Sequence, residues 1–195
     1  MLKIFSFLIF LSVLLTGCQN NFPLKQNISG NHYKLLNQDS SEVNFPDIAK
    51  NKIMVIGFIY THCPDICPMT THNMHIVQEK LQKEKINNVN FISLSFDPER
   101  DKPSILKKYA EIRGINLGNW SFLTGDQKNI KKILKEFNVN VLPGDSTVSD
   151  NGTVNYYLIH TDRISLVDQD GRLRKNYPGS QVNIDELIKD IKNLE

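Results

Sequence analysis

Short apolar runs alternate with amphipathic segments along most of the chain. The apolar runs have the length of strands buried on both faces of a sheet, and the segments between them repeat apolar residues at a helical period. This pattern predicts strands at residues 33–36, 52–60, 89–96, 120–123, 156–160, 163–167 and 173–177. It predicts helices at residues 68–84, 102–113, 127–137 and 183–191.

The order of these elements predicts the fold class. A strand–helix–strand–helix series is followed by a hairpin, with its turn at residues 168–171, and then by a last helix. This is the order of a thioredoxin-like α/β domain, in which a central mixed sheet is flanked by helices. About 165 residues are enough for one core, so we expect a single domain over residues 32–195 and a monomer.

Three of the predicted helices follow a residue whose side chain can accept a hydrogen bond from the first free N–H groups. These predicted caps are Asp101, Asp126 and Asn183. Residues 138–155 fit neither a helix nor a strand, because they are polar and rich in glycine, serine and aspartate. A loop of that length in a compact domain is usually functional or mobile, and we expect a mobile loop there.

The N-terminus has the pattern of an export signal. One positive charge, Lys3, precedes an apolar run at residues 4–15 that is shorter than the about 20 residues of a transmembrane helix. Small residues and Cys18 follow, which predicts a lipoprotein signal peptide over residues 1–17, a lipidated Cys18 and a flexible tether over residues 18–31. An uncleaved membrane anchor is the alternative. Either pattern places the domain in the bacterial cell envelope, facing the periplasm or the cell exterior.

The charge balance excludes one class of partner. Lysine and arginine number 23 and aspartate and glutamate 21, which leaves a net charge of +2 for the whole chain. A nucleic-acid-binding domain would carry a larger and more concentrated positive charge. We therefore expect no nucleic-acid partner.

Cys63 and Cys67 lie between the apolar run at residues 52–60 and the predicted helix that begins at Pro68. Both precede a proline, which favours extended geometry, so we expect both on a loop with Cys67 at the start of the helix. Free N–H groups and the helix dipole at that point stabilise a thiolate. Since the thiolate binds metals and attacks disulfides, the pair is predicted to be reactive.

Two thiolates can bind several soft or borderline metals. Cu(I), zinc and an iron–sulfur cluster all accept them, but a structural zinc site needs four protein ligands and only three cysteines are present. Adding one imidazole, from His160 at the end of a predicted strand, favours copper as Cu(I) or Cu(II). A structural disulfide is the alternative, although so short a loop would gain little stability from it.

The other histidines are weaker candidates. A histidine beside a strand is more often packed or solvated than a ligand, and by spacing alone this holds for His160 as well. His72 and His75 accompany Met69 and Met74 on the first predicted helix and could form a second soft-metal patch. We interpret these four side chains as helix surface and core.

Four segments resemble the motifs of the Sco/SenC copper chaperones, in the right order and over residues 33–192. They are Gly57–Pro68, Ser95–Pro103, Trp120–Gly125 and Tyr157–Thr161, the last followed by a turn at Leu166–Leu173. The resemblance implies a thioredoxin-like fold and copper ligation by Cys63, Cys67 and His160. It departs from the family at Ile159, where an aspartate is usual and could orient the imidazole.

The resemblance also implies a role and a partner. Sco/SenC proteins deliver copper to the binuclear Cu-A centre of cytochrome c oxidase, so we expect its Cu-A subunit or another copper or thiol protein as partner. Ligand exchange would replace Cys63 and Cys67 in turn by target thiolates. The loop at residues 138–155 precedes His160 and is predicted to move it in and out of coordination.

Two enzymatic functions remain open. Cys63 and Cys67 could be the redox pair of a thiol–disulfide oxidoreductase that reduces the cysteines of the oxidase copper site. Thioredoxin-like enzymes usually carry a cis-proline before the strand that follows, whereas residues 156–166 contain no proline, which favours metal binding. A thiol peroxidase would need a peroxide pocket, and the sequence indicates none.

Overall fold

The computed structural model describes residues 22–24, 26–148 and 154–195. The predicted signal peptide, Cys18 and the first residues of the predicted tether lie outside these ranges. The described part of that tether was wrongly predicted to be flexible, because Gln26 and Asn27 pair with Leu173 and Arg172 and Ile28 is buried. Within them, no helix combines the length and the apolar character that crossing a bilayer requires.

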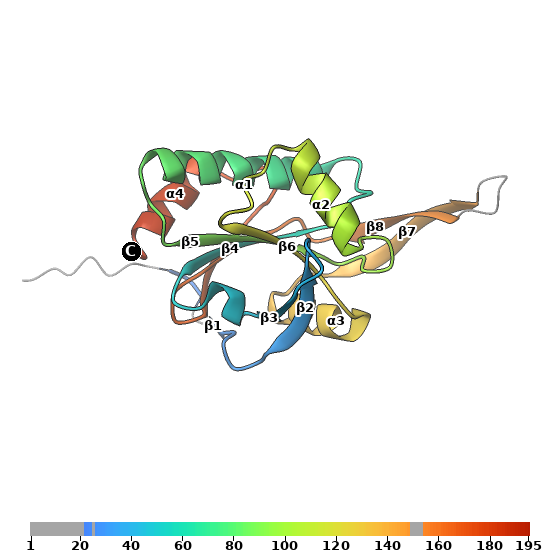
Figure 1. Cartoon of the computed structure of the whole chain (residues 1–195), viewed down its shortest axis with the longest axis horizontal. Helices are drawn as coiled ribbons and strands as arrows, with labels where there is room; N and C mark the ends of the chain where they lie inside the picture. Colours follow the sequence, from blue (N-terminus) through green and yellow to red (C-terminus); the bar gives the residue numbers. More distant parts are fainter. Residues whose placement is uncertain (1–21, 25, 149–153) are drawn as a thin grey trace, which may run out of the picture.

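Eight of the described strands form one mixed sheet, in the order β1-β10-β9-β4-β5-β6-β2-β3 (Figure 1). Strands β4, β5 and β6 are parallel, and the outer strands join them antiparallel. Their bounds are β1 (Gln26–Asn27), β2 (Tyr33–Asn37), β3 (Glu42–Phe45), β4 (Ile53–Ile59), β5 (Val89–Ser95), β6 (Trp120–Thr124), β9 (Ile164–Val167) and β10 (Arg172–Tyr177).

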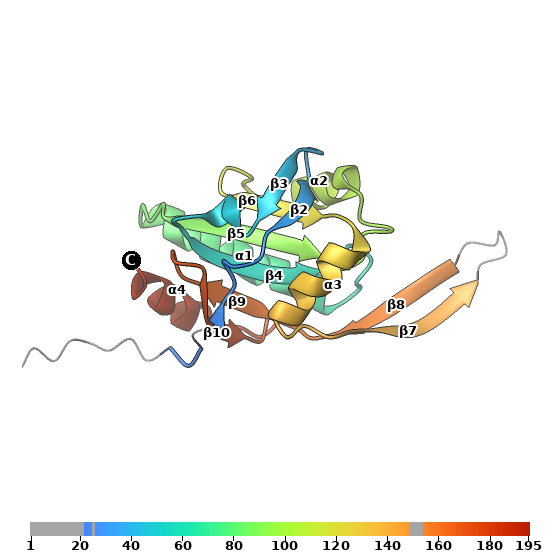
Figure 2. The same cartoon turned by 90° about the horizontal axis from the view of Figure 1, so that it is seen from below.

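Helices cover both faces of this sheet. On one face lie α1 (Ile66–Lys83), α2 (Pro103–Ile112) and α4 (Ile184–Lys192), and on the other lie α3 (Gln127–Glu136) and a short 3-10 helix at Asp47–Ala49 (Figures 1 and 2). A mixed sheet between helical layers confirms the predicted thioredoxin-like α/β fold. The hairpin predicted around residues 168–171 is confirmed as β9 and β10.

Helix α1 lies directly on the central strand β4. All seven residues of β4 are buried, as expected of a strand covered on both faces. A Cβ atom on Gly57 would approach Met74 Sδ to 2.6 Å, so only glycine lets the helix pack this closely. This contact places the end of β4 and the start of α1 at one edge of the sheet, with Cys63 on the loop between them and Cys67 in the first turn of α1.

The prediction of a loop over residues 138–155 was wrong for residues 141–148 and 154–155, which are strands, and residues 149–153 lie outside the described ranges. Strands β7 (Val141–Val148) and β8 (Val154–His160) pair antiparallel in a separate two-stranded sheet, which projects from the body of the domain (Figure 2). Most β7 side chains are exposed, because the arm packs against little else. A strand as exposed as β7 lacks the apolar alternation by which strands are recognised.

Two of the three predicted helix caps are confirmed and one is wrong. Asp126 accepts a hydrogen bond from Asn129 N at 2.9 Å, and Asn183 accepts one from Glu186 N at 3.1 Å. Asp101 is not a cap: Lys102 precedes α2 and makes no side-chain cap bond. Asp101 is fully buried instead, because its carboxylate binds groups on two other segments.

Candidate metal centre

The cysteines occupy two different kinds of backbone. Cys63 lies on the loop after β4, as predicted, but Cys67 is the second residue of α1. The expectation that Cys67 lies on the loop was therefore wrong. Pro68 is tolerated in the first helical turn because the N–H group that it lacks would have no partner there. Both thiols are free and buried, and Cys67 N donates to Cys63 Sγ at 3.4 Å.

The buried carboxylate of Asp101 fixes the start of the cysteine loop. It accepts hydrogen bonds from Thr61 N at 3.0 Å, from Thr61 Oγ1 at 2.5 Å and from Ser95 Oγ at 2.6 Å. Burial raises the pKa of Asp101, and these donors oppose that rise. The loop that leads to Cys63 is thus tied to the end of β5.

His160, the last residue of β8, turns one ring nitrogen toward the thiols. Its Nδ1 lies 3.1 Å from Thr161 O, and a carbonyl can only accept, so Nδ1 carries the proton and Nε2 has its lone pair free. Nε2 lies 3.5 Å from Cys67 Sγ. The ring packs against Tyr60 and Phe96, with centroids 5.9 and 4.7 Å away.

The two thiols have very different pKa values. A hydrogen bond from the Cys67 thiol stabilises the Cys63 thiolate and lowers the pKa of Cys63 to about 4. The same hydrogen bond, together with burial, raises the pKa of Cys67 above its ordinary value. At neutral pH Cys63 is therefore the nucleophile and first ligand, and Cys67 keeps its proton until another group displaces it.

The difference in pKa between the two thiols predicts how the alkylation rate of the reduced chain depends on pH. Because Cys63 is ionised above about pH 4, its rate of reaction with iodoacetamide should be nearly constant from pH 5.5 to pH 8. In Cys67→Ala the hydrogen-bond donor is gone, the pKa of Cys63 should return toward about 8.5, and the rate should fall about tenfold per pH unit below that value. Mass spectrometry of timed samples measures both rates. A tenfold fall per unit in the unmodified chain would contradict the low pKa.

Ile159 does not affect the orientation of His160. Its side chain is 63% exposed and lies opposite Leu142 in the hairpin register, on the face away from His160. A side chain at this position therefore points away from the imidazole, whose Nδ1–H is already bonded to Thr161 O. The departure from the Sco/SenC pattern changes the surface of the hairpin and leaves the ligand geometry intact.

A cluster that the sequence did not predict attaches the hairpin to the domain. The Arg100 guanidinium stacks 3.5 Å above the Tyr156 ring, forms an ion pair with Asp97 and donates to Tyr156 O at 3.0 Å. Tyr156 Oη donates to Asp97 Oδ1 at 2.8 Å. Tyr60 Oη accepts from Leu158 N at 3.2 Å. The strand is thus held two and four residues before His160. The spacing of Asp97 and Arg100 was visible in the sequence, but their aromatic partner was not.

The second soft-metal patch is not assembled. Met74 is fully buried against Gly57, His72 is exposed, and His75 Nε2 lies 3.6 Å from Glu79. Within the described ranges, Cys63, Cys67 and His160 are the one group of three or more histidine, cysteine or acidic residues whose ligand atoms converge, all within 4.8 Å of one another.

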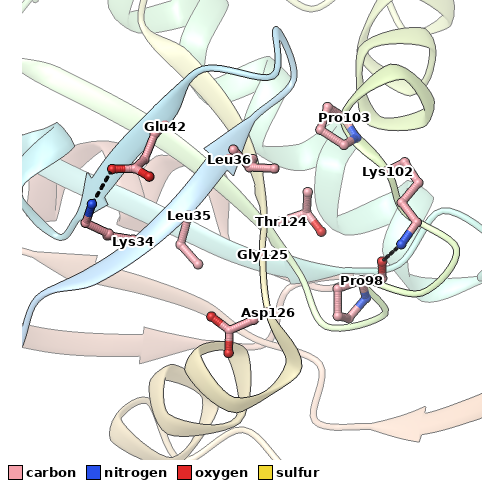
Figure 3. Close-up of a pocket in the computed structure, with 10 residues that line it drawn as sticks. All are labelled: Lys34, Leu35, Leu36, Glu42, Pro98, Lys102, Pro103, Thr124, Gly125 and Asp126. Atoms are coloured by element: carbon pink, nitrogen blue, oxygen red, sulfur yellow. Dashed lines mark hydrogen bonds and ion pairs between the residues drawn. The ribbon is translucent and has the colours of Figure 1, made fainter.

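A hollow of about 220 Å³ lies apart from these three residues, between β2 and the start of α2 (Figure 3). Lys34 is paired with Glu42 across its rim, and Lys102 Nζ donates to Pro98 O. Its remaining lining is largely apolar or backbone. None of the three converging residues lines it, so it adds nothing to the chemistry of the thiols.

Comparison with known proteins identifies close relatives. The family model for SCO1/SenC matches residues 23–195. The SCO1 protein homolog of Bacillus subtilis (strain 168) is 35% identical over 190 residues, which cover 95% of this chain and 92% of that protein.

Two solved structures share the fold. Bradyrhizobium japonicum ScoI with copper bound is 30% identical, with a TM-score of 0.69 over 85% of this chain and 99% of that one. BsSco, a member of the Sco family of cytochrome c oxidase assembly proteins in which a disulfide switch was identified, is 34% identical. Its TM-score is 0.70 over 88% of this chain and 95% of that one.

Proposed function

This chain belongs to the SCO1/SenC family, and we propose that it binds copper through Cys63, Cys67 and His160 and delivers it to the Cu-A centre of cytochrome c oxidase. The observation that carries this proposal is the convergence of the three ligand atoms within 4.8 Å. The relatives support it, because ScoI has been solved with copper bound and BsSco belongs to a family of oxidase assembly proteins.

The donor set suits Cu(I). Bonds from imidazole nitrogen and thiolate sulfur to an ion of comparable size are about 2.0 to 2.3 Å long, so two ligands of one ion lie at most about 4.6 Å apart. Ligand atoms within 4.8 Å of one another therefore need to approach only slightly to share one ion. Soft thiolates select Cu(I) over harder divalent ions. Copper is the cargo here, and the protein supplies two sulfurs and one nitrogen.

The unequal thiols suggest an order of loading and release. The Cys63 thiolate binds first, and the metal then displaces the Cys67 proton, so loading should release about one proton at neutral pH. His160 Nε2 completes the set without losing a proton, because Nδ1 holds it. In delivery, acceptor thiolates replace Cys67 and Cys63 one at a time, and copper keeps its oxidation state.

For the location, we propose a lipid anchor at Cys18 that holds the domain on the outer side of a bacterial membrane, in the periplasm or at the cell exterior. The short apolar run, the small residues before Cys18 and the polar tether support this proposal. A tethered domain can reach a membrane-bound oxidase without leaving the surface.

A thiol–disulfide oxidoreductase is the second candidate function, and the low pKa of Cys63 favours it. The Cys63 thiolate would attack a disulfide of the oxidase copper site, and Cys67 would resolve the mixed disulfide. The target would gain two electrons and two protons, and a Cys63–Cys67 disulfide would form. The disulfide switch identified in BsSco supports this candidate.

Competition with a coloured Cu(I) chelator tests the proposed site. Removing His160 by substitution with alanine should weaken Cu(I) binding by about 100-fold, because a metal site with four ligands binds with about 10–16 kcal/mol, or roughly 2.5–4 kcal/mol per ligand. The matched control is His62→Ala, since the His62 side chain is exposed and lies outside the converging set. Equal affinities of the two variants would overturn ligation by His160.

A further inference from the structure

Helix α3 exposes a stripe of lysines. They are spaced so that all share one face of the helix, and every one is exposed: Lys128, Lys131, Lys132 and Lys135. Within the part of the chain that the structure describes, none of the four pairs with a carboxylate, whereas Lys34, Lys80 and Lys107 each do. Four unneutralised charges on one helix stand out in a chain whose net charge is only +2.

An apolar face of the β7–β8 hairpin adjoins this stripe. Leu142, Tyr157 and Ile159 are 60%, 50% and 63% exposed. Leu142 and Ile159 are opposite each other in the register, and Tyr157 shares their face because it lies two residues from Ile159. Lys131, Leu142 and Tyr157 line one hollow of about 560 Å³, so one α3 lysine lies beside this apolar face. Figure 2 shows α3 next to the base of the β7–β8 hairpin.

Of the two acidic side chains that line this hollow, one is already paired with an arginine and the other is exposed. Asp97 lines the same hollow, but it is 4% exposed and paired with Arg100. Glu99 is the other acidic residue of that lining. The surface therefore combines four free cations with large apolar side chains, a composition that fits the interface between lipid headgroups and acyl chains.

The start of the described chain packs at the end of this helix. Gln26 Nε2 donates to Glu136 O at 2.8 Å, and Asn31 Nδ2 donates to Glu136 Oε1 at 2.6 Å. Gln26 comes eight residues after Cys18, and a segment of eight residues spans at most about 29 Å when fully extended. An anchor at residue 18 would therefore hold α3 close to the bilayer.

We propose that the α3 lysines and the apolar face of the hairpin form a membrane-contact surface, with the lysines on anionic phospholipid headgroups and Leu142, Tyr157 and Ile159 at the acyl boundary. The proposal rests on the membrane attachment proposed above. A polybasic patch is one of the elements that bind anionic membranes beside a lipid anchor. His160 lies on the other face of the hairpin from Ile159, so the thiols stay turned toward an acceptor.

Lysine footprinting of the full chain, reconstituted with its own anchor, tests this surface. The vesicles contain phosphatidylcholine alone or phosphatidylcholine mixed with phosphatidylglycerol, and a membrane-impermeant acylating reagent reports each lysine by mass spectrometry. On the anionic vesicles the four α3 lysines should react at least about fivefold more slowly, and Lys83 and Lys108, exposed on α1 and α2 on the other side of the sheet, should change less than about twofold. Raised salt should remove the protection.

Variants separate the possible outcomes. Lys131→Glu with Lys132→Glu should restore the reactivity of Lys128 and Lys135, whereas the matched pair Lys83→Glu with Lys108→Glu should leave their protection unchanged. Failure of the chain to sediment with either kind of vesicle would overturn the attachment itself. Sedimentation without selective protection would overturn the contact surface and leave the attachment standing. Protection that appears only when an acidic partner protein is added would also contradict it.

Discussion

The Cys63→Ala variant is expected to lose about 10³-fold in Cu(I) affinity, the largest effect of any single substitution at the site. Cys63 supplies the thiolate that is already ionised at neutral pH, and a thiolate contributes at the upper end of the roughly 2.5–4 kcal/mol per ligand that metal sites provide. Competition with a Cu(I) chelator measures the affinity, and circular dichroism verifies that the variant is folded.

Met69→Ala is the matched control for this substitution. Its thioether is a soft sulfur in the first turn of α1. The side chain is 47% exposed, however, and does not belong to the group of ligand atoms formed by Cys63, Cys67 and His160. The control should therefore bind Cu(I) as the unmodified chain does. Equal losses in the two variants would show that sulfur near the helix start binds copper without a defined site.

Arg100→Ala is expected to lower the free energy of unfolding by about 3–5 kcal/mol, because it leaves the carboxylate of Asp97 buried without its partner. The Asp97 side chain is only 4% exposed, so water cannot replace the guanidinium. The substitution also removes the stacking on Tyr156, which helps to hold the strand that carries His160. Urea denaturation measures the change.

The control variant Arg113→Ala distinguishes the contribution of the buried ion pair from that of arginine stacking on a tyrosine ring. The Arg113 guanidinium lies 3.4 Å from the Tyr109 ring and donates to Tyr109 O, as Arg100 does with Tyr156, but it has no ion pair among the described residues. Its loss should lower the free energy of unfolding by about 1 kcal/mol. If both variants lost the same amount, the ion pair with Asp97 would not be what stabilises the hairpin.

The central strands and the helix caps could be predicted from the sequence because each depends on burial or contacts within a short segment of the chain. Strand β4 is buried along its whole length, so its sequence is continuously apolar, and the caps Asp126 and Asn183 act on neighbouring backbone. The cysteine pair was found for the same reason: its chemistry lies within five consecutive residues. Local patterns are sufficient where the structure depends on local contacts.

The remaining features depend on contacts between distant segments. Asp101 was predicted to cap a helix, but it binds Thr61, 40 residues earlier in the chain. Strand β7 has little buried surface, so its sequence has the polar character of a loop. His160 is 93 residues from Cys67, and only the resemblance to a family, not its spacing, indicated that the two meet.

Copper transfer to the separately purified apo Cu-A domain of cytochrome c oxidase tests the central claim most directly. The chain is loaded with Cu(I), mixed with the reduced acceptor, and separated from it for metal analysis. We expect copper to move to the acceptor, and an acceptor that lacks its copper-binding cysteines to receive none. Copper that stays on the chain, while the chain readily reduces the disulfide of an oxidised acceptor, would contradict delivery and assign thiol–disulfide exchange as the function.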